Sequence, residues 1–148
     1  MKGDQFDWTG LAIWIICAAV IGIVLGGAGS FHTHSSPELI NAIHQVETSG
    51  RLGPITGDDG RALGPLQIHR SCWIDSGIPG TYEDCASLEY SKRVFRSYVA
   101  RYATVARIGR EVTDQDRARI WNGGPNGYRK TATVKYWKKV ERELNNGR

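Results

Sequence analysis

The apolar residues of the chain concentrate in its first thirty positions. Residues 10–28, GLAIWIICAAVIGIVLGGA, contain no charged side chain and are almost entirely apolar. A helix needs about 20 such residues to cross the hydrocarbon core of a bilayer. A helix that is apolar on every side cannot be hidden inside a small domain. The pattern therefore predicts one transmembrane helix within residues 1–30, followed by a short linker over residues 31–36.

The charges that flank this segment predict its orientation. Lys2 precedes it, whereas no Lys or Arg follows it until Arg51. Basic residues stay preferentially on the cytoplasmic side of a membrane. We therefore expect a single pass through the inner membrane, with a cytoplasmic N-terminus and a periplasmic remainder. Three fates of the segment stay open: a permanent anchor, a cleaved signal peptide ending near Ser30, and a span that later leaves the bilayer.

Beyond the linker, apolar residues recur at helical spacing. Ser36-Pro37-Glu38 is typical of a helix start, and Gly50 marks the end of that helix. Further helices are predicted over residues 86–107, from the Thr113/Asp116 capping box to Trp121, and over residues 131–144. The Gly- and Pro-rich residues 51–66 predict a loop or small hairpin, and residues 122–127 a loop.

Composition and charge narrow the classes of partner. The 148 residues, 41% apolar and 23% charged, are typical of one folded domain and exclude a disordered chain. Residues 31–91 carry three basic and eight acidic side chains, and residues 92–148 carry fifteen and five. A basic surface attracts polyanions. Outside the cytoplasm the anionic cell wall is a better match than nucleic acid, so no nucleic-acid partner is expected; the oligomeric state stays unknown.

Glu47 is the strongest candidate for chemistry. It follows Ile43 by four residues and Ile40 by seven, so it shares the apolar face of the first predicted helix. Desolvation on that face raises the pKa of a carboxyl group, as a general acid at neutral pH requires. The structural alternative is a helix-end Glu that turns into solvent.

Two further carboxylates follow in the turn TGDDG, residues 56–60. Hydrolysis of a glycosidic bond commonly needs two carboxyl groups that flank the bond, one protonated and one ionised. A helix-end Glu and a turn residue, Asp58 or Asp59, would supply that pair across a cleft. Asp and Gly are also ordinary turn residues, so the pair by itself is unspecific.

Two blocks of sequence resemble the invertebrate-type (destabilase) lysozymes, within the broader lysozyme-like and lytic-transglycosylase superfamily. The first block, IHQVETSGRLGPITGDDGRALGPLQIHRSCWIDSG, spans residues 43–77. The second, WNGGPNG, spans residues 121–127 and is followed by Tyr136-Trp137. The order and spacing of the blocks cover most of residues 43–140, which is far more specific than the carboxylates alone.

The resemblance implies a lysozyme-like α+β domain over residues 37–148, mostly helical, with a small β-hairpin lobe over the cleft. It implies cleavage of the β-1,4 bond between N-acetylmuramic acid and N-acetylglucosamine in peptidoglycan, without a cofactor. Glu47 matches the general acid, and Asp58 matches the second carboxylate because Asp58-x-Gly60 keeps the family's register, with Asp59 as the alternative. The residues expected to contact substrate are Gln67, Ile68, His69, Asn122, Gly123, Gly124 and Tyr136.

The three cysteines depart from the family, whose members are rich in disulfides. In an oxidising compartment we predict a disulfide between Cys72 and Cys85. Cys17 lies in the predicted membrane segment, either as a small buried apolar residue or as a thiol that exchanges with that pair. No zinc-ligand spacing is present, and His32-x-His34 lacks a third ligand, so no metal site is predicted.

A membrane segment ahead of a muramidase domain is similar to the signal-arrest-release endolysins of phages. In these, a Gly- and Ala-rich span tethers an inactive enzyme to the inner membrane and later leaves the bilayer. We therefore predict a membrane-tethered glycoside hydrolase that acts on peptidoglycan. Two alternatives stay open: a lytic transglycosylase, which needs one Glu and no second carboxylate, and a non-enzymatic wall-binding protein of a lysis system or virion.

Overall fold

The computed structural model describes residues 36–147, which form α-helices and a small sheet. The helices are α1 (Pro37–Thr48), α2 (Arg70–Ser76), α3 (Leu88–Tyr102), α4 (Val105–Ile108), α5 (Asp114–Gly123) and α6 (Val134–Asn146). Short 3-10 helices lie at Tyr82–Ala86, Gly127–Arg129 and Thr131–Thr133. The strands β1 (Thr56–Gly57), β2 (Ala62–Leu63) and β3 (Ile68–His69) form an antiparallel sheet in that order. The described part is thus mostly helical with a small β lobe, as predicted.

The predicted membrane helix within residues 1–30, with Cys17 in it, lies outside the described residues, as do residues 31–35 of the linker. Among residues 36–147, no helix has both the length and the apolar character that crossing a bilayer requires. The membrane segment therefore stays a prediction.

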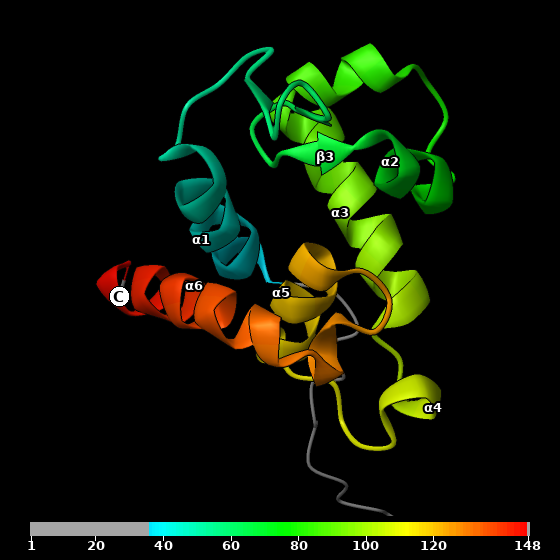
Figure 1. Ribbon diagram of the computed structural model, residues 1–148, viewed down its shortest axis with the longest axis vertical. Coiled ribbons are helices and arrows are strands. Elements are labelled where there is room, and N and C mark those ends of the chain that lie inside the picture. The colour runs from blue at the N-terminus through cyan, green and yellow to red at the C-terminus, as the bar shows by residue number, and fades with distance from the viewer. Residues whose placement is uncertain (1–35, 148) are drawn as a thin grey trace, which may run out of the picture. The chain divides into compact units, whose positions relative to one another are not determined.

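One face of each longer helix contributes to a shared hydrophobic core. α1 packs against α6 and α5, and α3 packs against α5; Figure 1 shows α1 and α6 side by side. The rings of Phe95 on α3 and Trp121 on α5 meet edge to face, with centroids 4.9 Å apart. The core residues of these helices with no exposed surface include Leu39, Ile40, Ile43, Val94, Phe95, Ile120 and Val140. This packing holds α1 against α5 and α6.

The first helix begins where the sequence predicts. Ser36 accepts the amide hydrogen bond of the residue three positions on at 3.1 Å, and a proline occupies the first helical position. The helix ends at Thr48, two residues before Gly50, because Ser49 takes a left-handed conformation with φ of 55°. Glu47 therefore stands in the last turn.

The helix predicted over residues 86–107 is two helices. α3 ends at Tyr102, and α4 forms one separate turn after Thr104. Thr104 has extended backbone, and its side-chain oxygen accepts the amide hydrogen bond of Arg107 at 3.2 Å, which starts the new helix. Val105 consequently lies 59% exposed rather than in the core.

The capping box of Thr113 and Asp116 is confirmed at the start of α5. Each side chain accepts a hydrogen bond from the backbone amide of the other residue, at 3.2 Å and 3.0 Å. The last helix, predicted over residues 131–144, starts with a 3-10 turn and becomes α-helical at Val134. The start of α5 therefore follows from its own capping residues.

The segment over residues 51–66, predicted as a loop or hairpin, supplies two strands of the sheet. The register places Ala62 of β2 opposite His69 of β3. Gly64 follows β2 with φ of 81°, and a Cβ there would stand 1.8 Å from the carbonyl oxygen of Cys85. Glycine therefore allows the sheet to approach the 3-10 helix at this point.

The structure describes Cys72 and Cys85 as free thiols, and the disulfide between them stays a prediction. The two lie close enough to interact electrostatically. Burial raises the pKa of the Cys72 thiol to about 12 and that of the Cys85 thiol to about 11. Both thiols therefore stay protonated at neutral pH, the unreactive form.

Candidate active site

One cleft collects most of the residues that the sequence singled out. It has a volume of about 770 Å³ and is lined by residues from α1, the sheet, α2, α3 and α5. The sequence-predicted residues that line it are Glu47, Asp58, Gln67, Ile68, His69, Asn122 and Gly124. The predicted residues Asp59, Gly123 and Tyr136 are not among its lining residues. Glu47 at the end of α1 and Asp58 in the turn after β1 thus line the same cleft.

Glu47 enters the cleft from the last turn of α1 and is half-buried. Burial raises the pKa of its carboxyl group from 4.5 to about 7, although the Tyr136 hydrogen bond and the charge of Lys139 lower it. The direction is the one that the helix pattern predicts. A substantial fraction of the Glu47 side chains therefore carries a proton at neutral pH.

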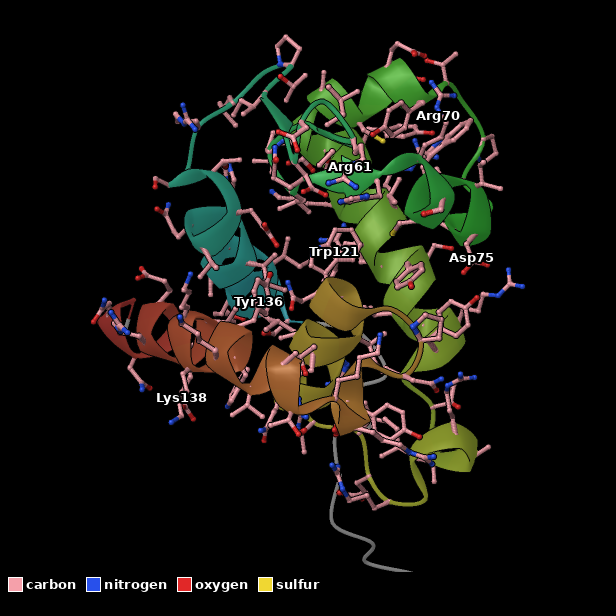
Figure 2. The ribbon with its side chains drawn as sticks, viewed as in Figure 1. Arg61, Arg70, Asp75, Trp121, Tyr136 and Lys138 are labelled. Carbon is pink, nitrogen blue, oxygen red and sulfur yellow. The ribbon has the colours of Figure 1, made fainter. Side chains whose placement is uncertain are left out.

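Tyr136 reaches the site by contacting Glu47. It stands on α6, near α1 (Figure 2), and its hydroxyl donates to Oε1 of Glu47 at 2.7 Å. Burial, together with the Glu47 carboxylate, raises the pKa of Tyr136 well above its usual value. The phenol therefore stays protonated and fixes one oxygen of Glu47, which leaves Oε2 free of that bond.

Asp58 stands in the turn between β1 and β2. Its φ is 53°, a left-handed conformation that Asp tolerates better than most residues. Arg61 Nη2 donates to Oδ1 at 3.0 Å, and Nε2 of His69 lies 3.2 Å from Oδ2. Figure 2 shows Arg61 beside β3. Both oxygens of the carboxylate thus have a basic neighbour.

The neighbouring Asp59 has a different environment. Its side chain is 98% exposed, against 49% for that of Asp58, and its nearest basic atom, in Arg61, lies 4.0 Å away. Asp59 does not line the cleft. Of the two turn carboxylates, Asp58 is therefore the one available to a molecule in the cleft.

Gln67 lines the cleft, but its amide group is used within the β lobe. Nε2 donates to the carbonyl oxygens of Ile55 at 3.2 Å and Gly64 at 2.9 Å. Its Oε1 occupies the space beside Gly57, where a Cβ would be 1.9 Å from it. The residue adopts a φ of 50° to make these contacts. Gln67 therefore shapes the wall of the cleft.

The loop predicted over residues 122–127 contributes unequally to the site. Its first two residues complete α5, and Asn122 and Gly124 line the cleft. Gly123 instead accepts a hydrogen bond from Lys130 Nζ at 2.6 Å, and a Cβ there would be 2.5 Å from the side chain of Thr133. Gly123 has a packing role.

Three large residues of the cleft were not predicted as site residues: Asp75 on α2, Tyr98 on α3 and Trp121 on α5. Figure 2 shows the places of Asp75 and Trp121. Asp75 accepts the hydroxyl hydrogen bond of Tyr102 and pairs with Arg101 at 3.5 Å. Asp75 and Trp121 stand inside the two blocks of sequence that resemble the family, and this was the available signal. Tyr98 gives no signal, because it resembles an ordinary core position of its helix.

No group of three or more His, Cys, Asp or Glu side chains among residues 36–147 is placed to hold a metal ion. The cleft residues described above can supply carboxylate chemistry, from Glu47 with its raised pKa and from Asp58.

Comparisons with known proteins place the chain in a family. The destabilase family model matches residues 38–143. Lysozyme 1 of Crassostrea virginica is 37% identical over 118 residues, which are 77% of this chain and 63% of that protein. The lysozyme of Ostrea edulis is 37% identical over 89 residues, 57% of this chain and 64% of that protein. The matched part thus spans less than two thirds of these relatives' length.

Solved structures agree with the sequence comparisons. An inhibitor-bound lysozyme from Meretrix lusoria is 32% identical and superposes with a TM-score of 0.64, covering 72% of this chain and 88% of that one. The Tapes japonica lysozyme is 30% identical, with a TM-score of 0.62 and the same coverage. The fold is therefore lysozyme-like, and this chain belongs to the destabilase family of invertebrate-type lysozymes.

Proposed function

We propose that this chain is a muramidase, a glycoside hydrolase that cleaves the β-1,4 bond between N-acetylmuramic acid and N-acetylglucosamine in peptidoglycan. The observation that carries the proposal is the pairing of Glu47, whose pKa is raised to about 7, with Asp58 in one cleft. Membership of a family whose named relatives are lysozymes supports the same chemistry.

Glu47 is the general acid. A protonated carboxyl group must donate to the oxygen of the departing sugar. Its pKa of about 7 keeps a large protonated fraction at neutral pH, where an unperturbed Glu has almost none. Because Tyr136 holds Oε1, the proton is delivered from Oε2. Proton donation of this kind contributes roughly 10²–10⁴-fold to rate.

Asp58 is the second carboxylate. It stabilises the positive charge that develops on the sugar ring, attacks the ring as a nucleophile, or activates a water molecule. Arg61 and His69 lie within 3.0 Å and 3.2 Å of its two oxygens. A lytic transglycosylase requires no such group, so the presence of Asp58 in the cleft favours hydrolysis.

The biological setting is part of the proposal. The apolar residues 10–28 would tether the chain to the inner membrane, with the catalytic domain in the periplasm and the tether released as in signal-arrest-release endolysins. Protease treatment of spheroplasts and carbonate extraction of membranes test this. The tether is supported if external protease digests the catalytic domain on spheroplasts and if the chain stays in the membrane fraction after carbonate extraction. A chain that stays protected in the cytoplasm contradicts it.

The enzymatic proposal is tested with the full chain purified in a mild non-ionic detergent. Peptidoglycan zymograms compare the parent chain with Glu47→Gln, Asp58→Asn and the matched control Asp59→Asn. We expect losses of about 10²-fold or more for the first two variants and less than about twofold for the exposed Asp59.

Mass spectrometry of the released fragments then identifies the reaction. Reducing muramic acid ends establish a muramidase, whereas 1,6-anhydro ends assign a lytic transglycosylase. A folded parent chain that binds the wall without cleaving it would make the protein a non-enzymatic wall binder.

A further inference from the structure

The sheet brings a histidine next to the proposed second carboxylate. Gly57, Ala62 and His69 form one row across the three strands, because Gly57 pairs with Ala62 and Ala62 pairs with His69. Residues in register on neighbouring strands direct their side chains to the same face of the sheet. Asp58 follows Gly57 directly. The histidine of β3 and the carboxylate after β1 therefore meet across the middle strand.

The small residue in the middle of the row makes this contact sterically possible. β1 and β3 are separated by two strand spacings, about 10 Å. Ala62, between them, is 98% buried and presents only a methyl group. Nε2 of His69 thereby reaches within 3.2 Å of Oδ2 of Asp58. A larger side chain at position 62 would stand between the two.

The turn that carries Asp58 needs such support. Residues 58, 59 and 60 all have positive φ, of 53°, 56° and 81°. Left-handed conformations of residues other than glycine cost of order 1 kcal/mol each, so the turn is locally strained. Arg61 anchors Oδ1 and the Asp58 carbonyl, at 3.0 and 2.9 Å. Arg61 belongs to the same turn, whereas His69 connects the carboxylate to another strand.

We propose that His69 is a positioning residue for Asp58: its imidazole fixes the second oxygen of the carboxylate and holds the group in its cleft-facing direction. This inference rests on the proposed muramidase function. The cation and one neutral tautomer of histidine both present N–H at Nε2, so the contact persists through either form. His69 acts on the rate through Asp58.

A positioning role predicts a specific kinetic signature. Loss of the imidazole lets the carboxylate swing from its productive direction, while Arg61 still retains one oxygen. Misplacement by about 1 Å of a reacting group costs up to about 10²-fold, and partial retention makes the expected loss about tenfold in kcat. KM stays within about twofold, because substrate binding elsewhere in the cleft is unchanged.

Two variants of equal side-chain length separate positioning from packing. His69→Gln keeps an N–H donor at the end of the side chain, and His69→Met removes it. Turnover of soluble peptidoglycan fragments by the full chain in detergent gives kcat and KM for each. We expect Met to lower kcat about tenfold and Gln to restore most of it. The matched control is Arg70→Gln, whose guanidinium faces Glu83 at 3.6 Å and the Tyr82 ring rather than Asp58.

A double-mutant cycle completes the test. In an Asp58→Asn background, His69→Met should cause no further loss of kcat, since the group it positions is gone. An equal loss in both backgrounds, a rise in KM without a fall in kcat, or equal rates for Met and Gln would overturn the proposal. If Asp58→Asn leaves no measurable rate, the test rests on the His69 variants in the parent background. The proposal then requires a fall in kcat without a rise in KM for His69→Met, and recovery of kcat for His69→Gln.

The outcomes distinguish this inference from the proposed function. A parent chain that is active and depends on Glu47, but is indifferent to His69, refutes only the positioning role. A folded parent chain with no hydrolytic activity refutes the muramidase function and removes the basis of the positioning role with it.

Discussion

Replacing Glu47 with Gln should stabilise the fold at alkaline pH while abolishing activity. The carboxyl group has a pKa of about 7 in the folded chain, against 4.5 for a solvated one. Below pH 4.5 both the folded and the unfolded chain hold the proton on Glu47, so its ionisation does not change the free energy of unfolding. Between 4.5 and 7 the unfolded chain ionises first, so the wild-type fold loses stability as pH rises. Above pH 7 that loss is complete.

The magnitude follows from the size of the shift. A change in pKa from 4.5 to about 7 corresponds to about 3 kcal/mol. Because Glu47 is half-buried and solvent screens part of the effect, we expect about 2 kcal/mol. Gln keeps an oxygen that accepts the Tyr136 hydrogen bond and carries no charge at any pH. For a domain of this size, about 2 kcal/mol raises Tm by about 8 °C.

Thermal unfolding followed by tryptophan fluorescence measures this difference. The Tm of Glu47→Gln minus that of the parent chain is determined at pH 4 and at pH 8.5, in the same non-ionic detergent. The gain should be about 8 °C larger at pH 8.5. The matched control, Glu38→Gln, alters an exposed residue in the first turn of the same helix and should give no stabilisation at pH 8.5, because a carboxylate there faces the positive end of the helix dipole. An equal difference at both pH values would refute the raised pKa and, with it, the acid role.

Three further predictions test other parts of the structure. Tyr136→Phe removes a hydrogen bond that lowers the Glu47 pKa, so the alkaline limb of the pH–activity profile should move to higher pH. Gly64→Ala should destabilise the fold by more than about 2 kcal/mol in urea unfolding, because its Cβ would clash with the carbonyl of Cys85 at a φ of 81°. Replacing the exposed Lys138 and Arg142 on α6 with Gln should weaken sedimentation with anionic cell wall at low salt and matter less at about 0.3 M salt.

The parts of the fold that sequence predicts correctly are those with local causes. The start of α1 and the capping box at Thr113 depend on residues three positions apart, which the sequence displays directly. The break at Thr104 was missed because the apolar spacing continues through it, while one hydroxyl group starts a new helix.

Predicting the site requires information about contacts between residues that are far apart in the sequence. Helical spacing identifies Glu47 as a carboxylate on an apolar face, but Tyr136, its hydrogen-bond partner, lies 89 residues away. The resemblance to a family identified the second carboxylate and favoured Asp58 over Asp59. The lower exposure of the Asp58 side chain favours the same choice. The contact between Asp58 and His69 depends on strand register, and two-residue strands give no sequence signal that would fix it.

The environment of Glu47 is better explained by chemistry than by stability. The packing of α1 against α6 buries the carboxyl group, and the Tyr136 hydrogen bond with the charge of Lys139 offsets only part of the desolvation. A Gln at this position would keep the hydrogen bond without the electrostatic penalty, so folding alone gives no reason for an acid. A proton donor at neutral pH requires that penalty, because desolvation brings the pKa near 7. Strongly perturbed carboxyl groups in clefts mark functional sites for this reason. Loss of activity and gain of alkaline stability in the same Glu47→Gln variant would be two results of one cause.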